Sequence, residues 1–208
     1  MKKIILWVVI LIVILASIVI LTSKEKQIDQ EKTFSINDKT KINVKTDKTK
    51  VIVTQKNINE IKVRLSGKEK VPFGKTKLEV NESNDSLDLQ IGGKSLIVFE
   101  KSNVCLYIDV PETYTGDLVI ETNKAGISYS CKELKNNLKI ANDLSKIDVD
   151  VPSNSDFVLN TKRSIGGINN DFDSDGKNSS RNVNEKIGDG KYMVDISTNI
   201  GEININKK

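Results

Sequence analysis

The stretch LVIETNKAGISY, residues 118–129, is followed at residues 138–149 by LKIANDLSKIDV, which has the same order of apolar and polar positions. The pattern occurs again at residues 157–168 and 193–205. The first three copies begin about twenty residues apart, and the last follows after nearly two such steps. This regular spacing indicates a domain built from repeated structural units.

Each copy joins two short runs of alternating apolar and polar residues across a turn that contains Gly, Asn or Asp. Alternation with period two is typical of a strand with one buried face. A single copy cannot bury its Leu and Ile residues, whereas a stack of copies can. The sequence therefore predicts an all-β, solenoid-like domain of short stacked strands. A β-sandwich is the alternative, because short strands at regular spacing also suit that architecture.

The alternation begins upstream at Phe34, so residues 34–206 are expected to form one repetitive β domain. From Phe34 to Leu65 the expected strands are about ten residues apart, half the later repeat, as two strands per unit require. The apolar run Val104–Val110 predicts a further strand that ends at Pro111.

The N-terminal part contains an uninterrupted apolar run from Ile4 to Thr22. About twenty apolar residues can cross a bilayer as a helix, and this run is more uniform than the apolar part of a secretory signal. We expect residues 1–23 to be a transmembrane anchor that contacts lipid through residues 4–22, followed by a polar stalk at residues 24–33. Cleavage of a signal peptide near Ser23 is the alternative. The simplest topology is a single-pass protein of the cell membrane with its domain outside the cytoplasm.

The composition argues against catalysis. None of the 208 residues is histidine, which removes the commonest general base and metal ligand, and two cysteines cannot form a zinc cluster. We therefore expect a protein that is not an enzyme and has no cofactor, with calcium as the one ion considered below.

The charge is uneven along the chain. Residues 24–77 hold 15 Lys and Arg against 7 Asp and Glu, although the whole chain carries a net charge of only +4. This basic part can be a solvated face, or it can attract anionic lipid headgroups or wall polymers. We do not expect nucleic acid as a partner, because the lysines are not interleaved with aromatic residues.

Three segments carry a resemblance to a bacterial family: residues 104–111, residues 118–127 and residues 187–203. They contain a strand that ends in Pro and the recurring pattern apolar-x-apolar-x-Thr/Ser-x-x-Gly-x-Ile. On these residues the chain resembles the Toastrack, or putative-adhesin, domain of envelope-stress proteins of Gram-positive bacteria, including relatives of the Lia-type membrane proteins. Ser145-Lys146 departs from the pattern, because Gly is expected there. The resemblance implies a stacked β-structure outside the membrane, with no catalytic residues to transfer.

The segment Asp171–Gly176 contains carboxylates at loop positions 1, 3 and 5 and Gly at position 6, as in the first half of an EF-hand calcium loop. Asp171, Asp173 and Asp175 are therefore candidate calcium ligands. Asn182 occupies position 12 and cannot supply the bidentate carboxylate, which predicts weak binding, on the order of 10⁻⁴ to 10⁻³ M. The alternative is a polar insertion that needs no ion.

Cys105 and Cys131 are the two cysteines of the chain. Outside the cytoplasm they are permitted to form a disulfide. Strand alternation places their side chains on opposite faces, which argues against pairing unless the turn at Lys132 resets the register.

The sequence thus favours a non-catalytic, membrane-anchored module that presents a repetitive surface to envelope polymers or to partner membrane proteins. One alternative is a calcium-stabilised binding module. Another is an enzyme acting on wall glycans, which needs two facing carboxylates; Asp148 and Asp150 are a local candidate pair.

Overall fold

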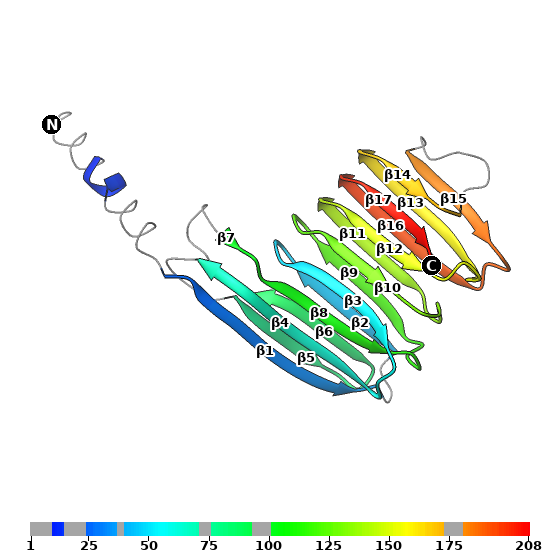
Figure 1. Ribbon diagram of the computed structural model, residues 1–208, viewed down its shortest axis with the longest axis horizontal. Coiled ribbons are helices and arrows are strands. Elements are labelled where there is room, and N and C mark those ends of the chain that lie inside the picture. The colour runs from blue at the N-terminus through cyan, green and yellow to red at the C-terminus, as the bar shows by residue number, and fades with distance from the viewer. Residues whose placement is uncertain (1–9, 15–23, 37–39, 71–75, 93–100, 173–180) are drawn as a thin grey trace.

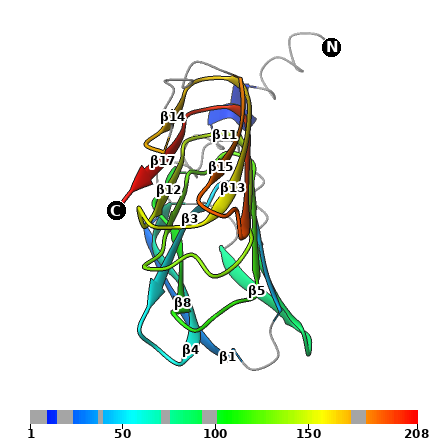
Figure 2. The same cartoon turned by 90° about the vertical axis from the view of Figure 1, so that its right-hand side faces the viewer.

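The computed structural model describes residues 10–14, 24–36, 40–70, 76–92, 101–172 and 181–208. In this part of the chain two mixed β-sheets face each other around one hydrophobic core (Figures 1 and 2). The predicted all-β class is confirmed. Neither sheet closes on itself within the described residues.

Sheet A contains, in spatial order, β1 (Lys26–Ser35), β4 (Glu60–Lys70), β8 (Cys105–Pro111), β3 (Lys50–Lys56), β10 (Ile127–Ser130), β12 (Ile147–Val151), β17 (Ile203–Lys207) and β14 (Ile168–Asn170). The short β7 (Lys101–Ser102) pairs with β4. Sheet B contains β15 (Asn182–Ile187), β13 (Phe157–Ile165), β16 (Tyr192–Ile200), β11 (Leu138–Leu144), β9 (Asp117–Thr122), β2 (Lys41–Thr46), β6 (Ser86–Gly92) and β5 (Lys77–Glu82).

Each sequence repeat forms a unit of two strands, the first in sheet B and the second in sheet A. The units are β2–β3, β9–β10, β11–β12, β13–β14 and β16–β17. Neighbouring units pair in parallel and in register, so residues at the same place in the repeat lie side by side. Ile127, for example, pairs with Ile147, which pairs in turn with Ile203.

The units are not stacked in chain order. Strand β17 lies between β12 and β14, and β16 lies between β11 and β13. The C-terminal unit is therefore inserted between two units that precede it in the sequence, whereas the simplest solenoid stacks successive repeats. The inward residues of all units are similar aliphatics, so the repeat pattern alone does not select the neighbour of each unit.

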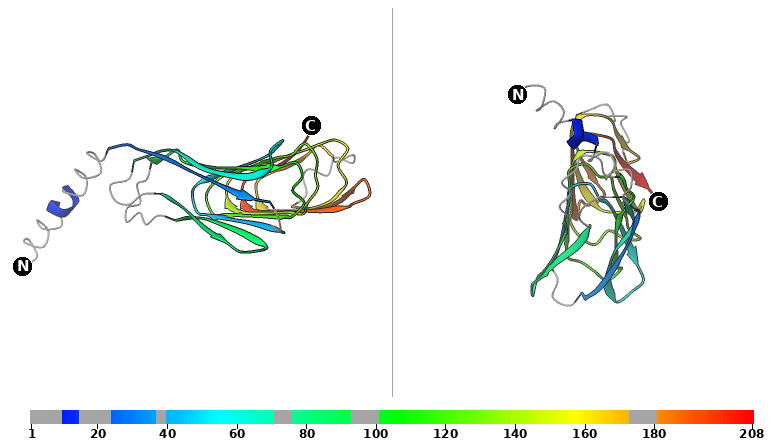
Figure 3. Two further views of the ribbon diagram at one scale, coloured as in Figure 1. Left: turned by 90° about the horizontal axis from the view of Figure 1, so that it is seen from below. Right: turned by 90° about the vertical axis from the view of Figure 1, so that its left-hand side faces the viewer.

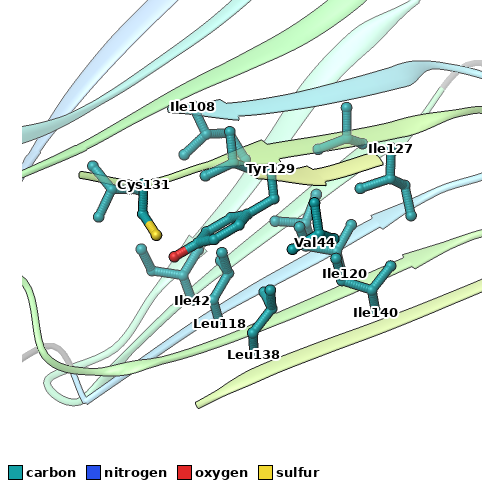
Figure 4. Close-up of a cluster of buried hydrophobic side chains, with 14 of the residues drawn as sticks. Ile42, Val44, Ile108, Leu118, Ile120, Ile127, Tyr129, Cys131, Leu138 and Ile140 are labelled. Atoms are coloured by element: carbon teal, nitrogen blue, oxygen red, sulfur yellow. The ribbon is translucent and has the colours of Figure 1, made fainter. Parts of the chain in front are cut away.

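The core consists of rows of side chains that point inward from the two sheets (Figure 4). Ile42, Leu118 and Leu138 form one such row in sheet B, and Ile108 and Tyr129 of sheet A face the same interior. Each of these side chains is at most 4% exposed. Burial of apolar surface stabilises by about 25 cal/mol per Å², so these rows hold the two layers together.

The turns that lead from sheet B to sheet A line one edge of the molecule. We call it the turn edge; it comprises residues 47–49, 123–126, 145–146, 166–167 and 201–202. Here backbone packs against backbone: a Cβ atom on Gly166 would overlap the carbonyl oxygen of Gly201, and one on Gly201 would overlap that of Ser145. Gly166 also has a φ of +130°, which residues with a side chain rarely adopt. Glycine at position 166 thus permits the turns to stack.

Antiparallel strands cover the first end of the stack, where β1 pairs with β4 and β5 pairs with β6. The Gln30 side chain of β1 joins the two sheets at this end. Its amide nitrogen donates to the carbonyl oxygen of Thr76 at 3.3 Å, and its amide oxygen accepts from the N–H of Leu78 at 3.2 Å.

The other end is covered by β15, which is antiparallel to β13. The buried Asn170 side chain of sheet A donates to the Glu185 carboxylate of sheet B at 2.8 Å. Phe172 packs edge-on against Phe157, with 5.2 Å between the ring centroids. These contacts close the core beyond the last unit.

Strand β1 occupies most of residues 24–33, which corrects the predicted polar stalk. Ile28 points inward and is fully buried, whereas the outer face and free edge of the strand are polar. Polar residues are usual on edge strands because they discourage pairing with other chains. This explains why the segment reads as a stalk in the sequence.

Residues 10–14 are helical. No helix in the described residues is both long and apolar enough to cross a membrane. The predicted span, residues 4–22, lies mostly outside the described residues and stays a prediction.

Candidate ligand-binding groove

Two hollows lie next to each other on the outer face of sheet B. One has a volume of about 540 Å³ and is lined by β5, β6, β2 and β9; the other, of about 340 Å³, is lined by β2, β9, β16 and the start of β11. Both are lined by Val119 of β9. Together they form what we call the sheet B groove, which crosses six neighbouring strands, or about 24 Å at the usual strand spacing.

The first half of the groove is lined mainly by carboxylates and amides. Asn43 of β2 and Asp88 of β6 are in register, and the Asn43 amide donates to the Asp88 carboxylate at 2.6 Å. Strand β5 bends away from the other layer (Figure 2). The Glu79 carboxylate of β5 lies over Gly92, where a Cβ atom would meet it at 2.6 Å. The remaining lining residues here are Val44, Lys45, Val80, Asn81, Leu89, Gln90 and Glu121.

The second half is organised by Asn137, just before β11. Its amide donates to the Asp117 carboxylate at 3.0 Å, and its amide oxygen accepts from the N–H of Met193 at 3.0 Å. These bonds join β9, β11 and β16 at the floor of the groove. The other lining residues of this half are Lys41, Leu118, Leu138, Lys139 and Asp195.

The groove offers a dense array of hydrogen-bonding groups. Its side chains include five carboxylates, three ammonium groups and four amides; these are Glu79, Asp88, Asp117, Glu121, Asp195, Lys41, Lys45, Lys139, Asn43, Asn81, Gln90 and Asn137. The formal charge of this set is −2, and amides both donate and accept hydrogen bonds. Among the described lining residues none is aromatic. The chemistry suits an extended polar ligand that carries little negative charge.

Of the predicted calcium ligands, only Asp171 lies in the described residues; Asp173 and Asp175 lie outside them. The Asp171 carboxylate accepts a hydrogen bond from the backbone N–H of Lys207 at 3.1 Å. The described residues contain no group of three or more His, Cys, Asp or Glu side chains that could hold a metal ion. The calcium site stays a prediction.

Both cysteines are free thiols in the structure. Cys105 pairs with Lys50 of β3, and Ser130, which precedes Cys131, pairs with Thr54 of the same strand. From position 50 to position 54 a strand extends about 13 Å. A disulfide requires Cα atoms within about 7 Å, so this arrangement keeps the two cysteines apart.

Cys131 is buried beside the Tyr129 ring (Figure 4). Burial raises the pKa of the Cys131 thiol to about 11, and a hydrogen bond with Tyr129 opposes part of this rise. The pKa of Tyr129 is also raised, first by burial. Cys131 therefore stays a neutral thiol at physiological pH.

Asp148 and Asp150, the candidate carboxylate pair for a glycan-acting enzyme, lie on the outer face of sheet A rather than in the sheet B groove. The amides of Asn204 and Asn206 donate to them at 2.7 Å each. Lys146 pairs with Asp148 at 2.8 Å. Both carboxylates are thus engaged in bonds that link neighbouring strands.

The groove residues were not identifiable as a set from the sequence. Asn43, Asp88 and Val119 belong to strands that are far apart in the chain and become neighbours only because β2 pairs with both β6 and β9. In the sequence these residues appear only as the polar positions of alternating strands. An ordinary solvated face of a sheet gives the same pattern.

Comparisons with protein-family models and with curated proteins give no match. Among solved structures, the chain is similar to a putative cell adhesion protein from Clostridium sporogenes ATCC 15579, with a TM-score of 0.61 and 16% identity over 88% of this chain and 100% of that chain. A putative adhesin from Parabacteroides merdae ATCC 43184 aligns over 85% of this chain and 80% of that chain, with 12% identity and a TM-score of 0.32. The first similarity shows that the two proteins share a fold, and the second is too weak to support an argument.

Proposed function

We propose that this protein is a non-catalytic, adhesin-like module, anchored in the cell membrane by residues 4–22, whose domain lies outside the cytoplasm and binds a polar envelope polymer in the sheet B groove. The observation that carries this proposal is the groove itself. It crosses six strands and presents amides and carboxylates along its length. Such a site is long enough for several units of a chain molecule.

The ligand class follows from the charge of the groove. A net formal charge of −2 repels strongly anionic polymers, whereas a neutral glycan chain finds both donors and acceptors. We therefore propose the glycan strands of the cell wall as the ligand.

Three further observations support the membrane anchor, the display of the domain and the adhesin-like role. The apolar run Ile4–Thr22 has the length of a membrane span. The units of parallel, in-register strands provide a repetitive surface suited to display. The Clostridium sporogenes protein with the same fold is described as a putative cell adhesion protein, and the sequence resemblance extends the proposal to envelope stress.

A single substitution at the centre of the groove tests the binding site. Val119→Arg places a long side chain where the two hollows meet. Ile52→Arg is the matched control, because Ile52 is also a half-exposed aliphatic residue on an outward strand position, but on sheet A. The full-length protein in detergent is tested for retention on purified peptidoglycan freed of teichoic acid, in which the amide bond to each peptide removes the charge of the muramic carboxyl group, so that the glycan strand is neutral.

We expect the wild type and Ile52→Arg to bind alike and Val119→Arg to bind at least about tenfold more weakly, which corresponds to about 1.4 kcal/mol. Binding by Val119→Arg equal to that of the wild type would show that the groove is not the site. Absence of binding by the wild type would exclude glycan strands as the ligand.

A further inference from the structure

An exposed aliphatic row lies beside the turn edge. Leu144, Ile200 and Ile165 are the last residues of β11, β16 and β13, and they are in register across these three strands. Their exposed fractions are 43%, 47% and 62%. We call these three residues the aliphatic row.

Isolated exposed aliphatic residues are common on protein surfaces, but a contiguous group marks a contact site more often. The row spans three adjacent strands, about 10 Å from first to last. In the β9–β10 unit the residue at the corresponding repeat position is Lys124, which lies in the turn, so a polar residue is compatible with this place in the repeat. Hydrophobic residues at the other three positions are therefore not required by the turn itself.

The turn edge is also the edge from which the chain enters the domain. Strand β1 is antiparallel to β4, β4 is antiparallel to β8, and β8 is parallel to β3. Hence β1 begins at the same edge as β3, next to the turns, as Figures 1 and 3 show. Three residues lie between Thr22, the end of the apolar run, and Lys26, so these two positions are at most about 14 Å apart.

The charge on this edge complements an anionic bilayer. Among the described residues, seven exposed lysines at strand ends or in turns along this edge outnumber four exposed acidic residues; the lysines are Lys24, Lys26, Lys48, Lys50, Lys77, Lys124 and Lys146, and the acidic residues are Glu25, Asp47, Asp143 and Glu202. Basic residues near an anionic membrane surface are attracted to it. The opposite edge carries both signs in similar number, since Asp85, Glu112, Glu133, Asp156 and Asp189 lie there with Lys41, Lys56, Lys132, Lys135, Lys191 and Lys208.

From these observations we propose that the turn edge rests on the outer surface of the lipid bilayer, with the aliphatic row in the headgroup region. The chain enters at β1, at one end of the stack, and the row lies near the other end. The domain is thereby held at two points with its strands upright. The sheet B groove, which crosses the strands, then runs parallel to the membrane. This inference rests on the anchor of the proposed function and does not depend on the groove ligand.

Tryptophan fluorescence in vesicles tests the contact. Trp7 is the one tryptophan of the chain, so Trp7→Phe gives a background without it. Ile165→Trp in this background places the probe in the aliphatic row, and Asn154→Trp places it in an exposed turn on the opposite edge. A third variant, Ile200→Trp, repeats the measurement at a second position of the row. The full-length variants are reconstituted in phosphatidylglycerol–phosphatidylcholine vesicles whose acyl chains carry bromine, which quenches nearby tryptophan.

We expect the fluorescence of the probes at positions 165 and 200 to fall roughly twofold relative to unbrominated vesicles, because interfacial side chains reach about 5–10 Å into the bilayer boundary. The probe at position 154 should be unchanged. Unquenched probes at 165 and 200 in vesicles that carry the protein on flotation would overturn the contact, and shielding of these probes from iodide in that case would assign the row to a second copy of the chain.

Flotation separates this inference from the proposed anchor. If the full-length protein does not float with the vesicles, the anchor is wrong, and the bilayer contact is excluded with it. Glycan binding is measured in detergent, so its outcome is independent of both.

Discussion

In the middle of the stack, from β3 to β17 in sheet A, each strand runs parallel to neighbours of nearly the same sequence pattern, whereas at the ends β1, β5 and β15 run antiparallel to theirs. In the middle, a neighbouring unit supplies hydrogen bonds and a matching aliphatic row. An end strand has a neighbour on one side only, so other contacts must cover the core. Repetition therefore provides the hydrogen bonds and core contacts of the middle strands, whereas the end strands need contacts of other kinds.

The side-chain hydrogen bonds show the same division. In the middle they run along the stack: the buried Asn142 amide donates to the hydroxyl of Thr122 on the next strand at 2.7 Å. At the ends they cross from one sheet to the other, as Gln30 does to Thr76 and Leu78. Polar side chains therefore align neighbours in the middle and join the layers at the ends.

The largest effect is expected where the turn of the β13–β14 unit touches the turn of the neighbouring β16–β17 unit. Gly166→Ala should lower the free energy of unfolding by about 4 kcal/mol, because the new Cβ overlaps the Gly201 carbonyl and the backbone has positive φ. Gly167→Ala is the control, since its Cβ would meet nothing within 4 Å, and we expect a change of about 0.5 kcal/mol or less. Urea unfolding of both variants measures the difference. Equal stabilities would show that the turns can separate without cost.

An intermediate loss of folding stability is expected at alkaline pH, where the buried Cys131 thiol ionises. Burial raises the pKa of Cys131 from 9.0 to about 11. An unfolded thiol ionises near its ordinary pKa, so the stability due to this group is complete below pH 9.0 and is lost as the pH rises to about 11. The loss should be about 2 kcal/mol.

Urea unfolding across this pH range measures the loss, with Cys131→Ala as the comparison. Tyr129 is present in both proteins; burial is the main cause of its raised pKa, and Cys131 adds to the rise, so the comparison measures Cys131 together with its effect on Tyr129. The variant should therefore lose less stability than the wild type. Parallel pH profiles would contradict the assignment to Cys131.

The smallest effect is expected at the first end of the stack. Gln30→Ala removes the amide that joins β1 to Thr76 and Leu78, and should cost about 1 kcal/mol. Because the loss is local, hydrogen exchange of the Leu78 amide should accelerate while that of Ile140 in the middle does not. Gln27→Ala, an exposed position on the same strand, is the control. Faster exchange throughout the molecule would show that the ends and the middle unfold together.

Much of the middle could be predicted from the sequence, and the ends could not. The positions of Ile127 and Ile147 repeat, and strand alternation translates directly into two layers with inward rows. Strand β1 has only two buried aliphatic or aromatic residues, Ile28 and Phe34, and one-sided pairing leaves the rest polar, so it resembles a linker. An edge strand is defined by its neighbour, which its own sequence does not reveal.

The groove shows the same limit. Its centre, Val119, is an ordinary strand residue in the sequence, and the hollow exists because β2, β6 and β9 meet there and β5 bends away. Asp148 and Asp150, in contrast, look functional in the sequence, because their spacing suggests a catalytic pair. The structure uses both to bind asparagines of β17. The role of an outward-facing residue depends on which strands lie next to its own. The alternation of apolar and polar residues does not specify that order.

The insertion of β16–β17 between earlier units affects how the chain folds while it is being synthesised. During translation, the units before it leave the ribosome while the place between β12 and β14 is still empty. Strands β16 and β17 are therefore made after both of the units between which they lie. Deleting residues 192–207 would remove an internal layer of the stack rather than trim one of its ends, and the complete stack can form only after this unit has been synthesised.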